Sequence, residues 1–364
     1  MTSTTMTMTS TADLTKLVRE SLDDPLAEIA QRHVEPVVYA SGSLSTAGLH
    51  RVRGTTTDGR PWSFFVKSIH SARHWPLPPA VPETQWEELV EGFPWRTDAD
   101  VYLAPPPLPA GLRLPRLHRI DDLGDDRLVL WLEDVQTVSA GWDLDRYRRA
   151  ARLLGALAAM RPVAATPDTP PDSGMRLYCA GAVQYFLSIL RDSATWRHPL
   201  VAAYADDLLR ADLLALADRI GPLLAAVERL PHALAHGDAS PQNLLVPADG
   251  SAEFVAVDWS WGSPTAVGFD LGQLLVGLAH AGVTDPSELP EIHTAIESAY
   301  AAEVDADPET VSFGYAATLV LRSAWTALPI DHLDAEPTPE LHEIFRKRAG
   351  LARFIVDIGR SLDV

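Results

Sequence analysis

The stretch ALAHGDASPQNLLVPADGSAEFVAVDWSWGS, residues 233–263, decides the fold of this chain. It holds two short β-prone runs, LLV and EFVAVDW, which the turn PADG joins, and helix-forming text surrounds it on both sides. The triplet His-Gly-Asp at 236–238 is followed by Asn243, and Asp258 ends the apolar run FVAV. Two carboxylates and an amide are therefore expected to emerge from a loop and a neighbouring β-hairpin.

This set of side chains suits phosphoryl transfer. In that reaction one carboxylate orients the attacking hydroxyl and accepts its proton, while an Asn oxygen and a second carboxylate hold Mg²⁺ against the nucleotide phosphates. Mg²⁺ takes hard oxygen ligands, which Asn243 and Asp258 supply. Ordinary turn chemistry also brings Asp and Asn close together, but it does not account for Asp258 after an apolar strand in a helical region.

The region before residue 136 is predicted to be β-rich. Four runs rich in β-branched and aromatic residues predict strands, at 34–41, 49–57, 62–69 and 127–135. The dipeptide Asp58-Gly59 predicts a hairpin turn between the second and third strands, because both residues tolerate positive φ angles. The same region is predicted to hold a short helix at 13–23 and a second helical stretch at 86–102. Two Pro-rich loops are predicted at 76–83 and 104–115.

Beyond Gly141 the apolar period becomes that of helices. Helices are predicted at 143–160, 175–193, 200–230, 267–281, 290–304, 308–328 and 338–362. We therefore expect an α+β protein of two lobes. A disordered Thr/Ser/Met tail is expected at 1–12, followed by a small antiparallel β-rich N-lobe that binds nucleotide at 13–132. An inter-lobe link is expected at 133–140, and a large helical C-lobe with the catalytic loops and the acceptor site at 141–364.

The order of motifs resembles a known family. His-Gly-Asp-x-x-x-x-Asn, then Val-Asp-Trp, then Gly-Phe-Asp-Leu-Gly at 268–272 is similar to the aminoglycoside phosphotransferase and choline kinase family of small-molecule kinases. The resemblance is strong over about 230–275 and weaker, but in the right order, over the rest of the chain. Protein kinases carry Arg where Gly237 stands and Phe-Gly where Trp259-Ser260 follows Asp258. The resemblance implies a two-lobed, protein-kinase-like fold, in agreement with the predicted lobes.

The resemblance also implies roles for single residues, with ATP and Mg²⁺ as cofactors. Asp238 matches the catalytic base, and Asn243 and Asp258 match the metal ligands. Lys67 matches the lysine that pairs the nucleotide phosphates, and Asp270 matches an Asp that supports the catalytic loop. We expect His236 to be a structural, hydrogen-bonding residue of that loop.

Lys67 has evidence of its own. The chain contains only three lysines, Lys16, Lys67 and Lys347, and one of them stands on a core-like strand. By alternation it shares a face with Phe65 and Ile69, so its ammonium is partly desolvated unless an anion meets it. A phosphate would be such an anion, whereas a strand-end lysine that reaches solvent is the alternative.

In relatives a Glu on the following helix holds this lysine. The stretch WRTDADVY, residues 95–102, resembles that region and makes Asp98 the partner. Asp is one methylene shorter than Glu, so Glu87, Glu88 or Glu91 could take that place, and Asp98 could be a plain surface acid.

Two further segments are expected to contact the nucleotide. The turn GSLSTAG at 42–48, with Ser43, stands where the family has its phosphate-covering loop, and its small residues let backbone N–H groups approach phosphates. The end of the fourth strand resembles the family's link between lobes, where the backbone of Glu133 and Val135 would face adenine.

Composition restricts the function class. The chain has 49 acidic and 30 basic side chains, a net charge of −19, which argues against nucleic acid as the main partner. A single cysteine, Cys179, excludes an intramolecular disulfide and a four-thiolate metal site. The sequence contains no run of about 18 apolar residues and no signal-peptide pattern, so we expect a cytoplasmic protein without a membrane partner, as a monomer or homodimer.

The expected function is an ATP-dependent kinase that moves the γ-phosphoryl group to a hydroxyl of a small-molecule acceptor. The acceptor expected first is an aminoglycoside-type antibiotic, which would give antibiotic resistance, or an amino sugar or sugar. The alternatives are a nucleotide-binding pseudokinase or regulator, and a kinase of another metabolite such as choline. A protein kinase is disfavoured because only a few residues separate Asp258 from the helix expected at 267–281.

Two features leave alternatives open. The acidic stretch 331–343 could line a pocket for a polycation, although a solvated loop is the simpler interpretation. The side chains of Trp259, Trp261 and Trp325 could stack on a substrate ring or pack in the core.

Overall fold

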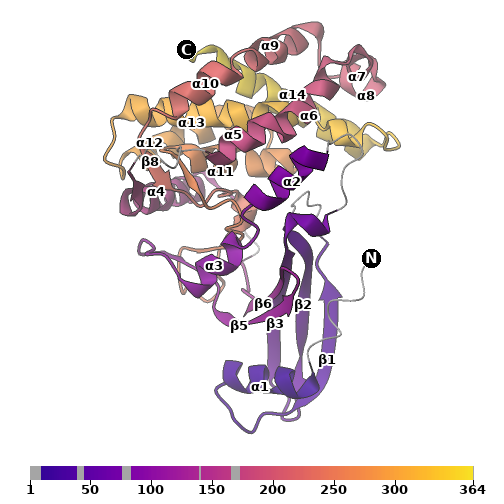
Figure 1. The fold of residues 1–364 in the computed structure, drawn as a ribbon, viewed down its shortest axis with the longest axis vertical. Helices are drawn as coiled ribbons and strands as arrows, with labels where there is room; N and C mark the ends of the chain where they lie inside the picture. Colours follow the sequence, from indigo (N-terminus) through magenta and orange to yellow (C-terminus); the bar gives the residue numbers. More distant parts are fainter. Residues whose placement is uncertain (1–9, 39–44, 76–82, 139–140, 165–172, 364) are drawn as a thin grey trace.

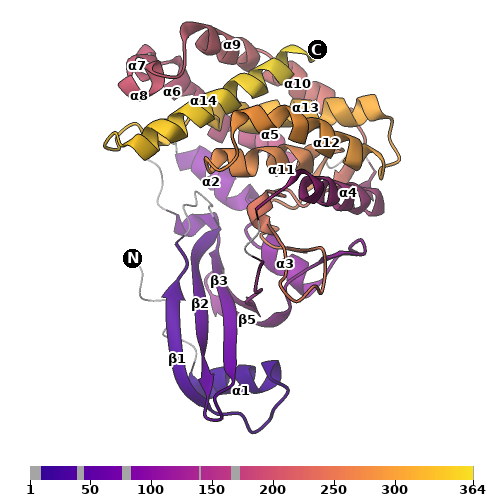
Figure 2. The same cartoon turned by 180° about the vertical axis from the view of Figure 1, so that it is seen from behind.

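The structure is a computed structural model that describes residues 10–38, 45–75, 83–138, 141–164 and 173–363. The chain forms two lobes, one built around an antiparallel sheet and the other from helices (Figures 1 and 2). The predicted α+β, two-lobed fold class is therefore confirmed. Residues 1–9, most of the predicted tail, and Ser43 in the predicted phosphate-covering turn lie outside the described residues.

The N-lobe sheet has five strands in the order β1-β2-β3-β6-β5. Its strands are β1 (Ile29–Pro36), β2 (Thr46–Thr56), β3 (Pro61–His70), β5 (Leu117–Gly124) and β6 (Arg127–Glu133). All neighbours in this sheet are antiparallel, and β3 pairs with both β2 and β6, so β3 is the central strand. Residue 67 of β3 lies opposite Leu49 of β2 and Leu130 of β6.

Alternation along β3 and β6 gives the sheet two apolar faces. Helix α1 (Thr11–Ser21) covers one face, where Leu14, Leu17 and Val18 pack against Phe64 and Trp131, among other residues. On the opposite face the cluster that contains Ile69, Leu128, Leu130 and Leu132 packs against Ala99 and Tyr102 of α3 (Thr97–Leu103). Lys67 is on this second face, so the sheet directs it toward α3.

The N-lobe differs from the sequence prediction in four places. The first strand spans 29–36 rather than 34–41, and the strand β5 was not predicted. The predicted helical stretch 86–102 is two helices, α2 (Glu83–Gly92) and α3, because Pro94 follows Phe93 and its ring cannot continue a helix. Helix α1 begins at Thr11, two residues inside the predicted tail, because the Ser10 side chain caps it by accepting from the Asp13 N–H.

The C-lobe is mainly helical. Its helices are α4 (Leu144–Met160), α5 (Ser173–Ala180), α6 (Ala182–Arg191), α7 (Ser193–Arg197), α8 (Pro199–Ala202), α9 (Asp207–Ala217), α10 (Ile220–Val227), α11 (Phe269–His280), α12 (Leu289–Ala301), α13 (Pro308–Ser323) and α14 (Pro339–Arg360). The helix predicted over 200–230 is three helices, because Asp206 caps α9 by accepting from the Leu209 N–H and so starts a new helix. The helix predicted over 175–193 is broken at Gly181.

Short strands of the C-lobe bring together the two loops that carry the predicted catalytic and metal-binding residues. One small sheet has the order β4-β10-β9, with strands β4 (Leu112–Arg113), β10 (Phe254–Ala256) and β9 (Leu244–Leu245). The other has the order β11-β8-β7, with strands β11 (Pro264–Ala266), β8 (His232–Leu234) and β7 (Pro162–Val163). The loop 235–243 leaves β8 and ends at β9, and the loop 257–263 runs from β10 to β11, so the two sheets fix both ends of both loops.

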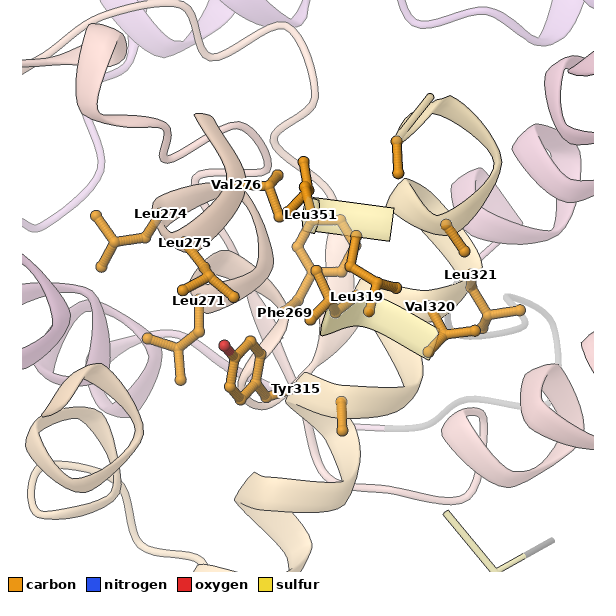
Figure 3. Packing of buried hydrophobic residues seen from close by; sticks show 14 of the residues in the cluster. Phe269, Leu271, Leu274, Leu275, Val276, Tyr315, Leu319, Val320, Leu321 and Leu351 are labelled. Carbon is orange, nitrogen blue, oxygen red and sulfur yellow. The ribbon is translucent and has the colours of Figure 1, made fainter. Parts of the chain in front are cut away.

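The C-lobe core is centred on α11 and α13. Leu271, Leu274 and Leu275 of α11 are completely buried, as are Tyr315 and Val320 of α13 (Figure 3). The two helices pack in direct contact, since a Cβ at Gly272 of α11 would lie at the ordinary van der Waals distance of 3.6 Å from the Leu319 Cα of α13. These two helices therefore form one rigid support directly behind the loop that carries Asp238.

No helix in the described ranges is both long and apolar enough to cross a membrane. The acidic stretch that begins at Asp331 is mostly exposed as far as Glu340, which agrees with a solvated loop rather than a pocket wall. Trp259 and Trp325 are completely buried, so core packing accounts for them, whereas Trp261 is half-buried.

Candidate active site

The side chain of Lys67 is buried between two carboxylates. Its Nζ lies 2.8 Å from Asp98 Oδ2 and 2.9 Å from Asp258 Oδ1, and only 7% of the side chain is exposed. Burial alone would lower the pKa of Lys67, but the charges of Asp98 and Asp258 outweigh it and hold the pKa above its ordinary value. Lys67 is therefore a fixed positive charge at the end of the sheet, and the solvent-reaching alternative does not hold.

Asp98 meets Lys67 in spite of its short side chain. It lies in the first turn of α3 and is almost completely buried, and its second oxygen, Oδ1, accepts a hydrogen bond of 2.9 Å from the Trp259 N–H. This one carboxylate joins the N-lobe lysine to the C-lobe loop that carries Asp258. The apolar contacts of Ala99 and Tyr102 with the sheet hold α3 close enough for an Asp to reach.

Asp258 adopts a left-handed backbone conformation, with φ of 61°. Residues other than Gly rarely adopt this region, and those that do are often found at functional sites. Its Oδ1 accepts hydrogen bonds from Lys67 and from Ser260 Oγ, each 2.9 Å long. Burial opposes its ionisation, but the nearby Lys67 ammonium keeps the pKa of Asp258 below its ordinary value.

Asp238 and Asn243 lie together at the other side of the site. The Asn243 Nδ2 donates to the Asp238 backbone oxygen at 2.9 Å and to its Oδ2 at 3.0 Å. Burial raises the pKa of Asp238, and the nearby Asp258 charge adds to this, whereas Arg322 opposes it. The five-residue spacing thus lets the amide fix the carboxylate directly.

Both ends of the Asn243 side chain have separate tasks in this arrangement. The Asn243 Nδ2 donates to Asp238, so the Asn243 Oδ1 remains available as a neutral oxygen ligand for a metal ion. Asp258 supplies a charged oxygen of the same kind, so the pair fits Mg²⁺, which usually takes one or two protein carboxylates together with phosphate oxygens. Within the described residues there is no cluster of three His, Cys, Asp or Glu that could hold a metal by itself.

The backbone before Asp238 is held by Asp270, as predicted. Asp270 Oδ2 accepts from the His236 N–H at 2.9 Å, and its Oδ1 accepts from the Gly237 N–H at 2.8 Å. His236 is completely buried and its Nδ1 accepts from the Asp238 N–H at 3.2 Å, which confirms the prediction of a structural role. Burial lowers the pKa of His236, which favours the neutral imidazole.

Gly237 is required for two reasons. Its φ is +89°, and a Cβ at this position would lie 2.1 Å from the Trp261 backbone oxygen. No side chain fits there without moving backbone. This explains physically why the loop has Gly where protein kinases have Arg.

Sequence reasoning missed Arg322, near the end of α13. Its Nη1 donates to the Gly237 backbone oxygen, and its Nη2 lies 3.4 Å from Asp238 Oδ1. It is 84 residues from Asp238 in the sequence and belongs to no motif. The sequence alone therefore gave no signal that Arg322 lies beside Asp238.

The inter-lobe link is fixed to both lobes. The Glu133 carboxylate accepts a bidentate pair from Arg113, at 2.7 and 2.8 Å, and the Glu133 N–H donates to the Arg116 oxygen. Further along, the Ala248 N–H donates to the Gln136 oxygen at 2.8 Å. The Glu133 side chain therefore holds the link in place, and a contact of the Glu133 and Val135 backbone with adenine stays a prediction.

No protein-family model matches the sequence, and no curated protein matches it. Solved structures do match. An aminoglycoside phosphotransferase from Alicyclobacillus acidocaldarius is 16% identical, with 91% of this chain and 92% of that chain covered and a TM-score of 0.51. The fold of this chain is similar to that of this aminoglycoside phosphotransferase. This phosphotransferase fold agrees with the motif order at 236–272, and at 16% identity the likeness concerns the fold alone.

Two other solved structures with lower TM-scores are similar over most of their length. An amicoumacin kinase in complex with AMP-PNP, Ca²⁺ and Ami is 15% identical, with 90% of this chain and 88% of that chain covered and a TM-score of 0.48. A choline kinase from Streptococcus pneumoniae is 15% identical, with 93% of this chain and 99% of that chain covered and a TM-score of 0.43.

Proposed function

We propose that this protein is an ATP-dependent phosphotransferase that moves the γ-phosphoryl group to a hydroxyl of a small molecule. One observation carries the proposal: Lys67 of β3, Asp258 of the loop 257–263, and Asn243 and Asp238 of the loop 235–243 come from three separate segments and converge on one polar site at the junction of the lobes. Each has the chemistry that its predicted role requires.

In the proposed reaction Asp238 orients the acceptor hydroxyl and accepts its proton as the oxygen bonds to the γ-phosphorus and the bond to the ADP oxygen breaks. Lys67 binds nucleotide phosphate oxygens and can do so because it is charged and pinned in place. Asn243 and Asp258 would hold Mg²⁺, which when bound neutralises phosphate charge. The main contribution of the protein is positioning, since the transition state of phosphoryl transfer is loose.

The acceptor that we propose is an aminoglycoside-type antibiotic, or an amino sugar or sugar. The net charge of −19 complements a cationic acceptor, and the similar structure from Alicyclobacillus acidocaldarius is named an aminoglycoside phosphotransferase. The same proposal includes resistance to such an antibiotic, a cytoplasmic location and a monomeric or homodimeric state. The pseudokinase alternative depended on the short side chain of Asp98, and the 2.8 Å contact of Asp98 with Lys67 removes that support.

The test is Mg·ATP turnover, followed by coupled ADP release, with aminoglycosides, amino sugars, neutral sugars and choline as acceptors. Asp238→Asn keeps the shape of the side chain and should lower kcat by about a thousandfold or more while ATP affinity changes little. Asp249→Asn, in the exposed turn between β9 and β10, is the matched control and should leave turnover unchanged. Near-normal turnover of Asp238→Asn would refute the assignment of the base.

A further inference from the structure

The positively charged side chain of Arg322 contacts the proposed base, Asp238, although Arg322 belongs to no sequence motif. The Arg322 guanidinium donates through Nη1 to the Gly237 backbone oxygen and approaches Asp238 Oδ1 through Nη2, at 3.4 Å. Only 11% of the Arg322 side chain is exposed. One guanidinium therefore contacts both the backbone of the catalytic loop and the carboxylate that the loop carries.

The guanidinium also makes cation–π contacts with two aromatic rings. Its Cζ lies 4.8 Å from the centroid of the Trp261 ring and 5.3 Å from that of Phe269. Contacts of this kind attract a cation to the ring and so favour this position of the guanidinium. Phe269 begins α11 and packs in the core beside α13, so the support of Arg322 is continuous with the most buried part of the C-lobe (Figure 3).

Arg322 and Asn243 hold different oxygens of the same carboxylate. The Asn243 Nδ2 donates to Asp238 Oδ2, whereas Arg322 faces Oδ1. An Asp side chain has two rotatable bonds, and a contact at each oxygen removes the freedom of both. The two peptide groups that flank the Gly237 Cα are held in a similar way, because Asp270 accepts from the Gly237 N–H and Arg322 donates to the Gly237 oxygen.

We propose that Arg322 is the positioning residue of the reaction: it clamps the catalytic loop and aims the Asp238 carboxylate at the acceptor hydroxyl. The inference rests on the proposed function, because it assigns a partner to the proposed base. Arg322 acts through Asp238, so its removal costs turnover only where Asp238 can still act.

A double-mutant cycle tests this dependence. Arg322→Gln should lower kcat by between about tenfold and about a hundredfold, the range expected when a reacting group is slightly misplaced, with the KM for ATP within about twofold. In an Asp238→Asn background the same change should have almost no further effect. Arg322→Lys keeps the charge but loses the fork, so it should lose less kcat than Arg322→Gln. Multiplicative losses in the cycle, or equal losses for Lys and Gln, would overturn the proposal.

The matched control is Arg219→Gln. Arg219 also donates to two backbone oxygens of the C-lobe, those of Gly359 and Leu362, and it is half-buried, but it does not take part in the site. Its replacement should leave kcat unchanged, and a loss equal to that of Arg322→Gln would mean that the effect is structural.

Crystal structures of the wild type and Arg322→Gln give a readout that needs no activity. The Asp238 carboxylate should turn away from its wild-type place when the guanidinium is absent, and an unmoved carboxylate contradicts the inference. If the wild type transfers phosphate to no acceptor, the proposed function fails, while these two structures still decide whether Arg322 positions Asp238.

Discussion

Replacement of Gly237 by Ala measures how tightly the catalytic loop is packed. Two costs add: a non-Gly residue in the left-handed region costs roughly 1–2 kcal/mol, and overpacking a tight site costs roughly 1–3 kcal/mol more. The second cost follows from the 2.1 Å between the added Cβ and the Trp261 oxygen, which is a backbone atom and cannot swing aside. We therefore expect the free energy of unfolding to fall by about 2–5 kcal/mol. Equilibrium urea unfolding, followed by far-ultraviolet circular dichroism, measures it.

Gly250→Ala is the matched control in the same lobe. Gly250 also has a positive φ, +67°, but a Cβ there meets no atom within 4 Å. Its replacement should therefore cost only the conformational part, roughly 1–2 kcal/mol, and leave turnover unchanged. If the two variants lose the same stability, the close approach of the Trp261 oxygen is not a real constraint, and the explanation given for Gly at 237 is wrong.

Three further predictions concern the charges of the site. Asp98→Asn removes one of the two anions at Lys67 and should lower the free energy of unfolding in urea by about 2–3 kcal/mol. This loss is smaller than the roughly 3–5 kcal/mol of a fully broken buried pair, because Asp258 remains. An unchanged unfolding midpoint would contradict the prediction. Asp270→Asn turns an amide donor toward the His236 or Gly237 N–H and should cost roughly 1–3 kcal/mol in the same assay, with lower kcat. The kcat/KM of the wild type, which reports the free enzyme, should fall as the pH drops through the pKa of Asp238, which burial raises above 3.8. A pH profile of kcat/KM with its acid limb at or below 3.8 would contradict this direction of the shift.

The sequence was sufficient where the deciding contacts are local. The loop 236–243 and the strand before Asp258 have a spacing that turns and hairpins impose, so the grouping of their polar side chains could be predicted. Lys67 could be placed on the correct face of its strand because alternation is a strict rule. Asp98 could be suggested only by resemblance, and its reach depends on how α3 packs against the sheet.

Other elements depend on tertiary contacts that leave little trace in the sequence. The strand β5, LHRIDDLG, lies at the edge of the sheet and carries two consecutive acids, so its pattern is weaker than that of the buried strands. The break at Phe93-Pro94 could have been predicted from Pro94, but the aromatic run around it has helical spacing. Arg322 lies in a buried helix with no charge pattern around it, and its position is known only once α13 is placed behind the loop.

The two hydrogen bonds from Asp270 make the catalytic loop an extension of α11. The N–H groups of His236 and Gly237 are buried and end on a side chain in the first turn of that helix, whose core contacts are among the most buried of the molecule. Their protons can exchange with solvent only when this helix separates from the loop. In deuterium oxide these two amides should therefore exchange as slowly as the amides inside α11, so the loop opens last, with the core, and the site keeps its shape during smaller fluctuations of the lobe.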